Sequence, residues 1–292
     1  MRERNPRRGI GFIVASTMIF AAQDGITRHL ATEYSPVMVV MIRFWFFGAF
    51  TLVLAARGPG GIRAAARSHY PGLQVVRGLV LVTQICLMSL AFVKLGLIPS
   101  HAVATVYPLI VTALSGPILG ERVGWRRWLA VAVGFAGELI ILEPGFGVFS
   151  PWALLPFLSA FLFALYVLLT RYVSDRDSSG TSFFFTGTVG ALAMTAVGFY
   201  YWQPMTPADW ALMAVLCVFS AAGHWFLIKA YAAAEAATIQ PFAYLQLVWI
   251  SILGVTLFGE VLRPNVAIGA ALVVAAGLFT LWRQYARARA RR

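Results

Sequence analysis

The chain has 292 residues, of which 60% are apolar or aromatic and only 12% are charged, and its mean hydropathy is +0.78. A soluble domain carries about a quarter charged residues, so this composition excludes a soluble globular protein and indicates a polytopic membrane protein. The net charge of +12 does not indicate nucleic-acid binding. The basic residues lie in tails and short loops between apolar runs, where they set membrane topology.

Ten apolar runs follow one another along the chain, each about as long as a helix that spans a bilayer. They lie at residues 9–29, 36–56, 72–93, 100–118, 124–142, 150–171, 181–201, 208–230, 238–258 and 265–282. Glycine and proline mark the breaks between them. Cys86 and Cys217 fall inside runs, as small buried apolar side chains do. We therefore predict an all-α polytopic membrane protein with ten transmembrane helices.

The distribution of lysine and arginine predicts the orientation. With a cytoplasmic N-terminus, the inner loops and tails hold 18 of these residues, whereas the outer loops hold only Arg28, Lys94 and Arg263. This asymmetry is the positive-inside pattern, so both termini are predicted to be cytoplasmic.

The two halves of the sequence resemble each other. With an offset of 143 residues, Ser16, Phe20, Thr27 and Arg28 align with Ser159, Phe163, Thr170 and Arg171. With offsets of 142 and 139, Gly48-Ala49 aligns with Gly190-Ala191, and Gly120-Glu121 aligns with Gly259-Glu260. Residues 1–145 and 146–292 then hold five runs each. Since five is odd, the second repeat is inverted relative to the first, as in alternating-access transporters.

The chain has a family resemblance, which rests on ten short spans, two five-helix halves and a run that ends in Gly-Glu in each half. The chain resembles the drug/metabolite transporter superfamily of the type with two EamA domains. Within it, the chain is similar to the YddG-type bacterial amino-acid exporters. The resemblance implies a multi-pass protein of the bacterial inner membrane with a central cavity between the two halves.

Polar side chains within the runs are the candidate substrate contacts, because such groups are costly in a membrane unless they have a partner or face water. The candidates are Gln23, Asp24, Gln84, His101, Thr105, Tyr107, Tyr166, His224, Trp225, Gln240 and Tyr244. The offset of 139 aligns His101 with Gln240 and Thr105 with Tyr244. We expect hydrogen-bonding walls with aromatic surfaces, suited to a zwitterion with an apolar side chain. The alternative is that these groups bond helix to helix or anchor the interface.

Each charged residue within or next to the runs has two possible roles. Asp24 either carries a proton or a substrate ammonium, or forms an ion pair with Arg28 four residues later. Arg43 either holds a substrate carboxylate or pairs with Glu33. Glu121 and Glu260 are expected to cap loops or to form gate contacts with nearby arginines.

These patterns favour a transporter that exports amino acids, aromatic and other mostly neutral ones, or similar small metabolites by alternating access. The alternatives are export of drugs or other metabolites and, less favoured, a membrane-embedded lipid-modifying enzyme. The sequence has no His-Glu-x-x-His, no Gly-x-Ser-x-Gly and no nucleotide-binding loop. We therefore expect no enzymatic activity, no cofactor, no metal and no nucleic-acid partner. The expected partners are a small-molecule substrate and the lipid bilayer.

Overall fold

The structure is a computed structural model that describes residues 5–104, 106–121, 124–142 and 151–258, with five isolated residues beyond them. Every regular element in these ranges is helical. The helices are α1 (Pro6–Glu33), α2 (Pro36–Arg57), α3 (Gly61–Ala65), α4 (Pro71–Leu95), α5 (Leu97–Ala104), α6 (Tyr107–Leu119), α7 (Trp125–Leu142), α8 (Leu154–Val173), α9 (Ser179–Gly198), α10 (Pro207–Ala233), α11 (Ala236–Ala243) and α12 (Leu245–Phe258).

Six segments of the described chain are long and apolar enough to cross a membrane: α1, α2, α4, α10, α8 with the turn before it, and α9 with the turn after it. The prediction of an all-helical, multi-pass membrane protein is therefore confirmed. Four of the long helices start with a proline in their first turn, where its missing N–H needs no partner. The predicted run at 265–282 lies almost entirely outside the described residues, as does Glu260.

Two predicted runs are each divided into two helices instead of forming one. Run 100–118 becomes α5 and α6, and run 238–258 becomes α11 and α12, with the second break at Tyr244. Pro108 accounts for the first break, because it opens α6 and cannot continue a preceding helix. Pro241 removes one hydrogen bond inside α11, three residues before the second break. Broken membrane helices are tolerated where their free backbone groups are buried in protein or face a cavity.

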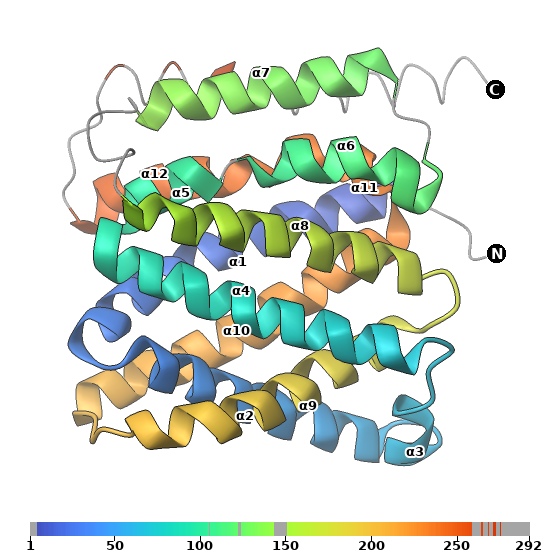
Figure 1. The fold of residues 1–292 in the computed structure, drawn as a ribbon, viewed down its shortest axis with the longest axis vertical. Coiled ribbons are helices and arrows are strands. Elements are labelled where there is room, and N and C mark those ends of the chain that lie inside the picture. The colour runs from blue at the N-terminus through green and yellow to red at the C-terminus, as the bar shows by residue number, and fades with distance from the viewer. Residues whose placement is uncertain are drawn as a thin grey trace.

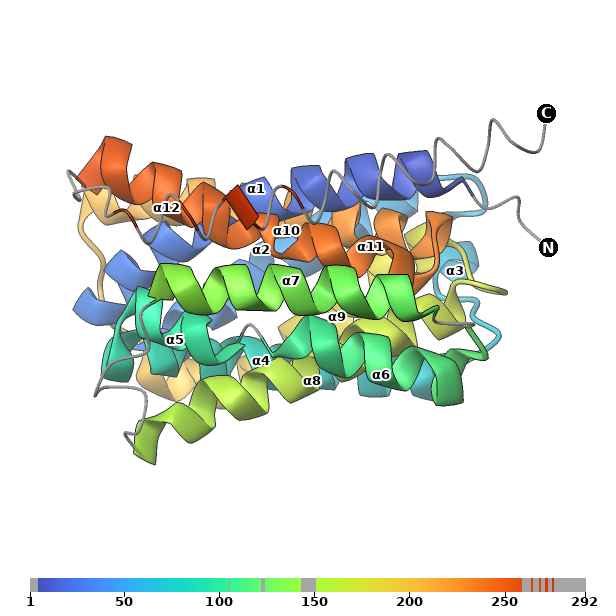
Figure 2. The same ribbon diagram turned by 90° about the horizontal axis from the view of Figure 1, so that it is seen from above.

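The two halves of the chain interleave rather than forming separate bodies. Each of the largest helix contacts joins one helix from each half: α1 with α10, α2 with α9, and α4 with α8. Figure 1 shows these helices side by side in one bundle, with α7 along one edge and α2 and α9 at the opposite edge. From above, α5 and α12 lie toward one end of the bundle, and α6, α11 and α3 toward the other (Figure 2). We call the latter the α3 end.

Helices α2 and α9 approach closely at glycines. A Cβ atom on Gly48 would lie 2.8 Å from the Cβ of Ala191, and one on Gly190 would lie 2.2 Å from Cδ1 of Phe44. Neither position has space for a side chain, so the two glycines set the distance between these helices.

Candidate functional site

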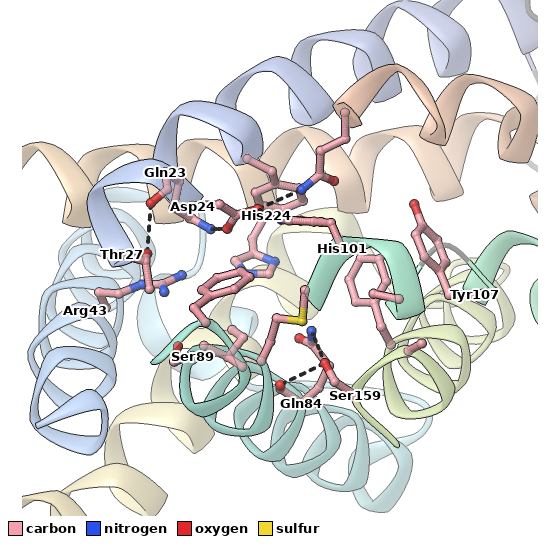
Figure 3. Close-up of a pocket in the computed structure, with 18 residues that line it drawn as sticks. Gln23, Asp24, Thr27, Arg43, Gln84, Ser89, His101, Tyr107, Ser159 and His224 are labelled. Carbon is pink, nitrogen blue, oxygen red and sulfur yellow. Dashed lines mark hydrogen bonds and ion pairs between the residues drawn. The ribbon is translucent and has the colours of Figure 1, made fainter. Parts of the chain in front are cut away.

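A cavity opens between helices of both halves of the chain. It holds about 670 Å³ of empty space, part of it open to solvent. Residues of α1, α2, α4, α5, α6, α8, α10 and α12 line it (Figure 3). The lining residues are Phe20, Gln23, Asp24, Thr27, Arg43, Gln84, Ile85, Met88, Ser89, Phe92, His101, Ala104, Tyr107, Ser159, Ala160, Phe163, His224 and Gln246.

Asp24 is the acidic centre of the cavity wall. Its Oδ2 accepts a hydrogen bond from Nε2 of Gln246 at 2.8 Å and lies 3.2 Å from Nε2 of His101. Its Oδ1 lies 3.4 Å from the donor Nε2 of Gln23. These contacts connect α1 to α5 and α12, so Asp24 faces the cavity cluster and not Arg28, whose side chain is exposed.

Arg43 brings a positive charge to the same cavity. Its Nη2 donates to Oγ of Ser220 on α10 at 3.1 Å. The side chain is 2% exposed, and it does not pair with Glu33, which lies on the surface. The cavity therefore holds one buried side chain of each formal charge, Asp24 and Arg43, on neighbouring helices.

Aromatic rings form much of the remaining wall. Tyr107 and Phe163 meet edge to face with ring centroids 5.0 Å apart, and Phe20 lies in the same way against His224 at 5.1 Å. Phe92 lies 5.5 Å from the ring of His101. Such faces offer apolar area and flat surfaces to a ligand.

The polar pair of Gln84 and Ser159 joins two helices at the cavity wall. Nε2 of Gln84 donates to Oγ of Ser159 at 3.0 Å, and that hydroxyl donates to the backbone oxygen of Gln84 at 3.2 Å. Both groups are engaged with each other, as in the interhelical bonds that hold membrane bundles together.

Six of the residues proposed from sequence come together at this cavity: Gln23, Asp24, Gln84, His101, Tyr107 and His224. Thr105 lies outside the described residues. The other four lie outside the cavity lining, in separate places. Tyr166 accepts a hydrogen bond from Nη1 of Arg77 at 3.3 Å, and Gln240 donates to the hydroxyl of Tyr231 at 2.8 Å.

Trp225 and Tyr244 pack against other helices. The ring of Trp225 lies 5.0 Å from that of Phe183, and Nζ of Lys229 lies 4.6 Å from its centre. Tyr244 lies against α7, where a Cβ atom on Gly134 would be 2.5 Å from its ring. Both contacts are with protein groups rather than with the cavity.

Sequence reasoning missed most of the apolar lining, including Met88, Phe92 and Ala160. Apolar residues in apolar runs have no polar signal that separates cavity walls from lipid-facing surface. Phe20 and Phe163 are two apolar lining residues for which the sequence does hold a signal. The repeat alignment pairs them, and both line the cavity.

A buried ion pair lies at the C-terminal end of α6, a helix that lies toward the α3 end (Figure 2). Oε1 of Glu121, which follows α6, accepts a hydrogen bond from the backbone N–H of Ala236 at 3.1 Å and lies 3.4 Å from Nε of Arg171. Both side chains of this ion pair are buried. The contact joins α6, α8 and the start of α11, and α6 packs directly on α11.

Comparison with known proteins identifies the family. The model of the EamA-like transporter family matches residues 7–143 and matches again at residues 150–282. The chain belongs to this family.

As an EamA-like protein, the chain is a transporter and not an enzyme, in line with the sequence-based expectation. It is 27% identical over 277 residues to the S-adenosylmethionine uptake transporter of Rickettsia prowazekii, covering 94% of this chain and 92% of that protein. It is 33% identical over 287 residues to the riboflavin transporter of Rhizobium johnstonii, covering 96% and 93%. A solved crystal structure with 19% identity matches 92% of this chain and 93% of its own with a TM-score of 0.74, which shows a shared fold.

Proposed function

We propose that this EamA-like transporter exports amino acids or similar small metabolites across the bacterial inner membrane by alternating access. The observation that carries the proposal is the cavity, where buried Asp24 and Arg43 face a space walled by aromatic rings. A zwitterion with an apolar side chain needs both charges and apolar faces. One relative is named an S-adenosylmethionine uptake transporter, and S-adenosylmethionine is an amino-acid derivative.

The proposed architecture is ten spanning helices in two inverted repeats, residues 1–145 and 146–292. Four observations support it. The family model matches twice, the fourth run of each half is a broken helix, and the repeat-aligned Gly48 and Gly190 both lie in the contact between α2 and α9. Helix contacts also come in equivalent pairs, since α1 packs on α12 as α8 packs on α6.

The proposed conformation is closed at the α3 end, which the arginine distribution assigns to the cytoplasm. Its support is the buried pair of Glu121 and Arg171 together with the packing of α6 on α11. The cavity lies away from that pair, in the C-terminal half of α1 and of α4 and in the N-terminal half of α8. Exposing such a cavity to one side at a time is the transport cycle of inverted-repeat carriers.

A second candidate substrate class is a flavin. The support is a relative 33% identical that is named a riboflavin transporter, and an aromatic wall that includes Phe92, Tyr107 and Phe163. A flavin offers a flat ring system for these faces but has no carboxylate or ammonium group for Arg43 and Asp24.

The test is counterflow in proteoliposomes that contain the purified chain, with labelled methionine, phenylalanine, tryptophan and riboflavin, with and without a pH gradient. We expect saturable exchange of an amino acid that Asp24→Asn reduces at least tenfold, while the exposed-site variant Glu33→Gln exchanges normally. Parallel assays in inside-out and right-side-out vesicles give the direction. Exchange of riboflavin alone would replace the amino-acid assignment, and exchange of none of the four would overturn both.

A further inference from the structure

Among the described residues, three arginines in the spanning helices are buried: Arg171, which pairs with Glu121, and Arg43 and Arg77, which have no such ion pair. The surroundings of Arg43 and Arg77 differ. Arg77 on α4 is 0% exposed and Arg43 on α2 is 2% exposed. A buried guanidinium is costly within a membrane unless its five N–H groups find acceptors. How each arginine meets this demand therefore separates a structural role from a ligand-binding one.

Arg77 uses all of its nitrogen atoms within the protein. Nε donates to Gln74 at 3.0 Å, and Nη1 donates to the hydroxyls of Tyr166 and Thr170 at 3.3 and 3.2 Å. Nη2 donates to Thr186 at 2.8 Å and to the backbone oxygen of Ser182. This arginine cross-links α4, α8 and α9, and none of its nitrogen atoms remains available to bind a ligand.

Among the described residues, Arg43 has a hydrogen-bond partner for one nitrogen atom only. Nη2 donates to Ser220, whereas Nε has no partner among the described residues although it is fully buried. Asp24 shares the cavity, but within the described chain no ion pair joins the two, and the Asp24 oxygens are occupied by Gln246, His101 and Gln23. Arg43 thus has N–H groups that the described part of the chain does not satisfy.

Two neighbouring residues on the cavity wall also have a buried polar atom without a hydrogen-bond partner. Oε1 of Gln23 and Nδ1 of His224 are buried and lack a partner in the described part of the chain. Buried polar atoms without partners are rare in native proteins. Four of those in the described chain belong to residues that line this cavity, since Nε2 of His101 also lacks a hydrogen bond although it lies 3.2 Å from Asp24, and a ligand in the cavity would supply partners. The edge of a guanidinium is shaped to hold the two oxygens of a carboxylate.

We infer that Arg43 is the carboxylate-binding residue of the cavity and restricts the transporter to substrates that carry a carboxylate. This inference rests on the proposed function, because it assigns one half of the zwitterion recognised there. Asp24 and Gln23 on the neighbouring helix α1 then contact the ammonium group of the substrate. The substrate class is then α-amino acids and their derivatives with a free carboxylate, not neutral ring compounds.

The experiment measures binding through the thermal unfolding midpoint of detergent-purified protein as methionine, phenylalanine and their amides are titrated. Each amide keeps the ammonium and side chain but lacks the negative charge. We expect the wild-type chain to bind each acid at least about tenfold more tightly than its amide, since a charge-assisted pair is lost. Arg43→Gln should bind acid and amide alike. Arg57→Gln, which removes an exposed arginine from the same helix, should keep the wild-type preference.

A second readout needs no ligand. Replacing an unsatisfied buried charge by an apolar side chain of similar length costs little, so Arg43→Met should unfold at or above the wild-type midpoint. Arg77→Met should unfold well below it.

The inference is overturned if the wild-type chain binds acids and amides equally, if Arg43→Gln keeps the preference, or if Arg43→Met is destabilised as much as Arg77→Met. Counterflow of a neutral solute together with equal binding of acid and amide would agree with a transporter. It would contradict only the assignment of Arg43 as the carboxylate-binding residue. Failure of all counterflow would remove the proposed function as well.

Discussion

Asp177, in the loop between α8 and α9, ties that loop to the start of α4. It accepts hydrogen bonds from Nε2 of Gln74 at 2.8 Å, from the backbone N–H of His69 at 2.7 Å and from the hydroxyl of Ser68. Burial disfavours the charged form, but these bonds outweigh burial and hold the pKa of the Asp177 carboxyl below its ordinary value of 3.8. Since Gln74 also accepts from Arg77, the loop is connected to the membrane-embedded cross-link.

The lowered pKa predicts a pH-dependent stability. A carboxyl group whose pKa is lower in the folded state stabilises the fold at neutral pH, and this contribution is lost as pH falls below 3.8 toward the folded value. Asp177→Asn should therefore unfold below the wild-type midpoint at pH 7, with a difference that shrinks as the pH is lowered to about 3. Thermal unfolding across this range checks it, with Glu33→Gln as an exposed control. A difference that is constant with pH would contradict the assignment.

Individual site residues were predictable from sequence only when they were polar. Gln23, Asp24 and His101 stood out because apolar surroundings make such groups costly, and the structure places them together at the cavity. The same signal also picked Tyr166 and Gln240, whose partners are the buried Arg77 and Tyr231. Polarity alone does not separate a group that waits for a ligand from one that the protein satisfies, because that depends on tertiary partners.

At the scale of elements, Glu121 links the end of α6 to Arg171 on α8 and to the backbone N–H of Ala236 at the start of α11. Breaking a buried ion pair by removing one partner costs several kcal/mol, far more than an exposed pair contributes. Glu121→Gln should therefore favour opening at the α3 end. Asp175 is the matched control, because its carboxylate lies 3.0 Å from Nη1 of the same Arg171 but its side chain is 60% exposed.

Cysteine accessibility measures this opening. Thr112 on α6 is fully buried, so Thr112→Cys in a chain with Cys86 and Cys217 replaced by alanine should react slowly with a maleimide. Adding Glu121→Gln should raise the labelling rate about tenfold or more, whereas Asp175→Asn should leave it within about twofold. Equal rates in the two variants would mean that the buried pair does not hold this end closed.

At the scale of the whole molecule, the two halves are joined at the glycines of α2 and α9. Gly48→Leu and Gly190→Leu should each destabilise the fold by about 3 kcal/mol, because overpacking forces the helices apart. Gly11 on α1 has nothing within 4 Å of an added Cβ, so Gly11→Leu is the control. Thermal unfolding and the recovery of monodisperse protein check the prediction. Variants as stable as Gly11→Leu would contradict a role for this contact in assembly.

The helix positions were largely predictable, since runs such as 36–56 and 72–93 differ from α2 and α4 by at most two residues at either end. Length and apolarity fix these helices. The breaks after α5 and α11 were not predicted, because proline shows where a hydrogen bond is missing but not whether the helix bends or ends. The interleaving of the halves was also beyond the sequence, since it depends on which apolar faces pack together.

The presence of Asp24 and Arg43 in one cavity also has an electrical consequence. Their formal charges cancel, so an empty carrier that reorients moves no net charge at this site, and neither does one loaded with a zwitterion. In the proposed cycle, the membrane voltage then acts on neither step through these two residues. A substrate with one additional positive charge would feel about 2.3 kcal/mol per 100 mV, enough for roughly fiftyfold accumulation on the negative side. Export of such a cation would run against the resting voltage, whereas export of a neutral amino acid would not.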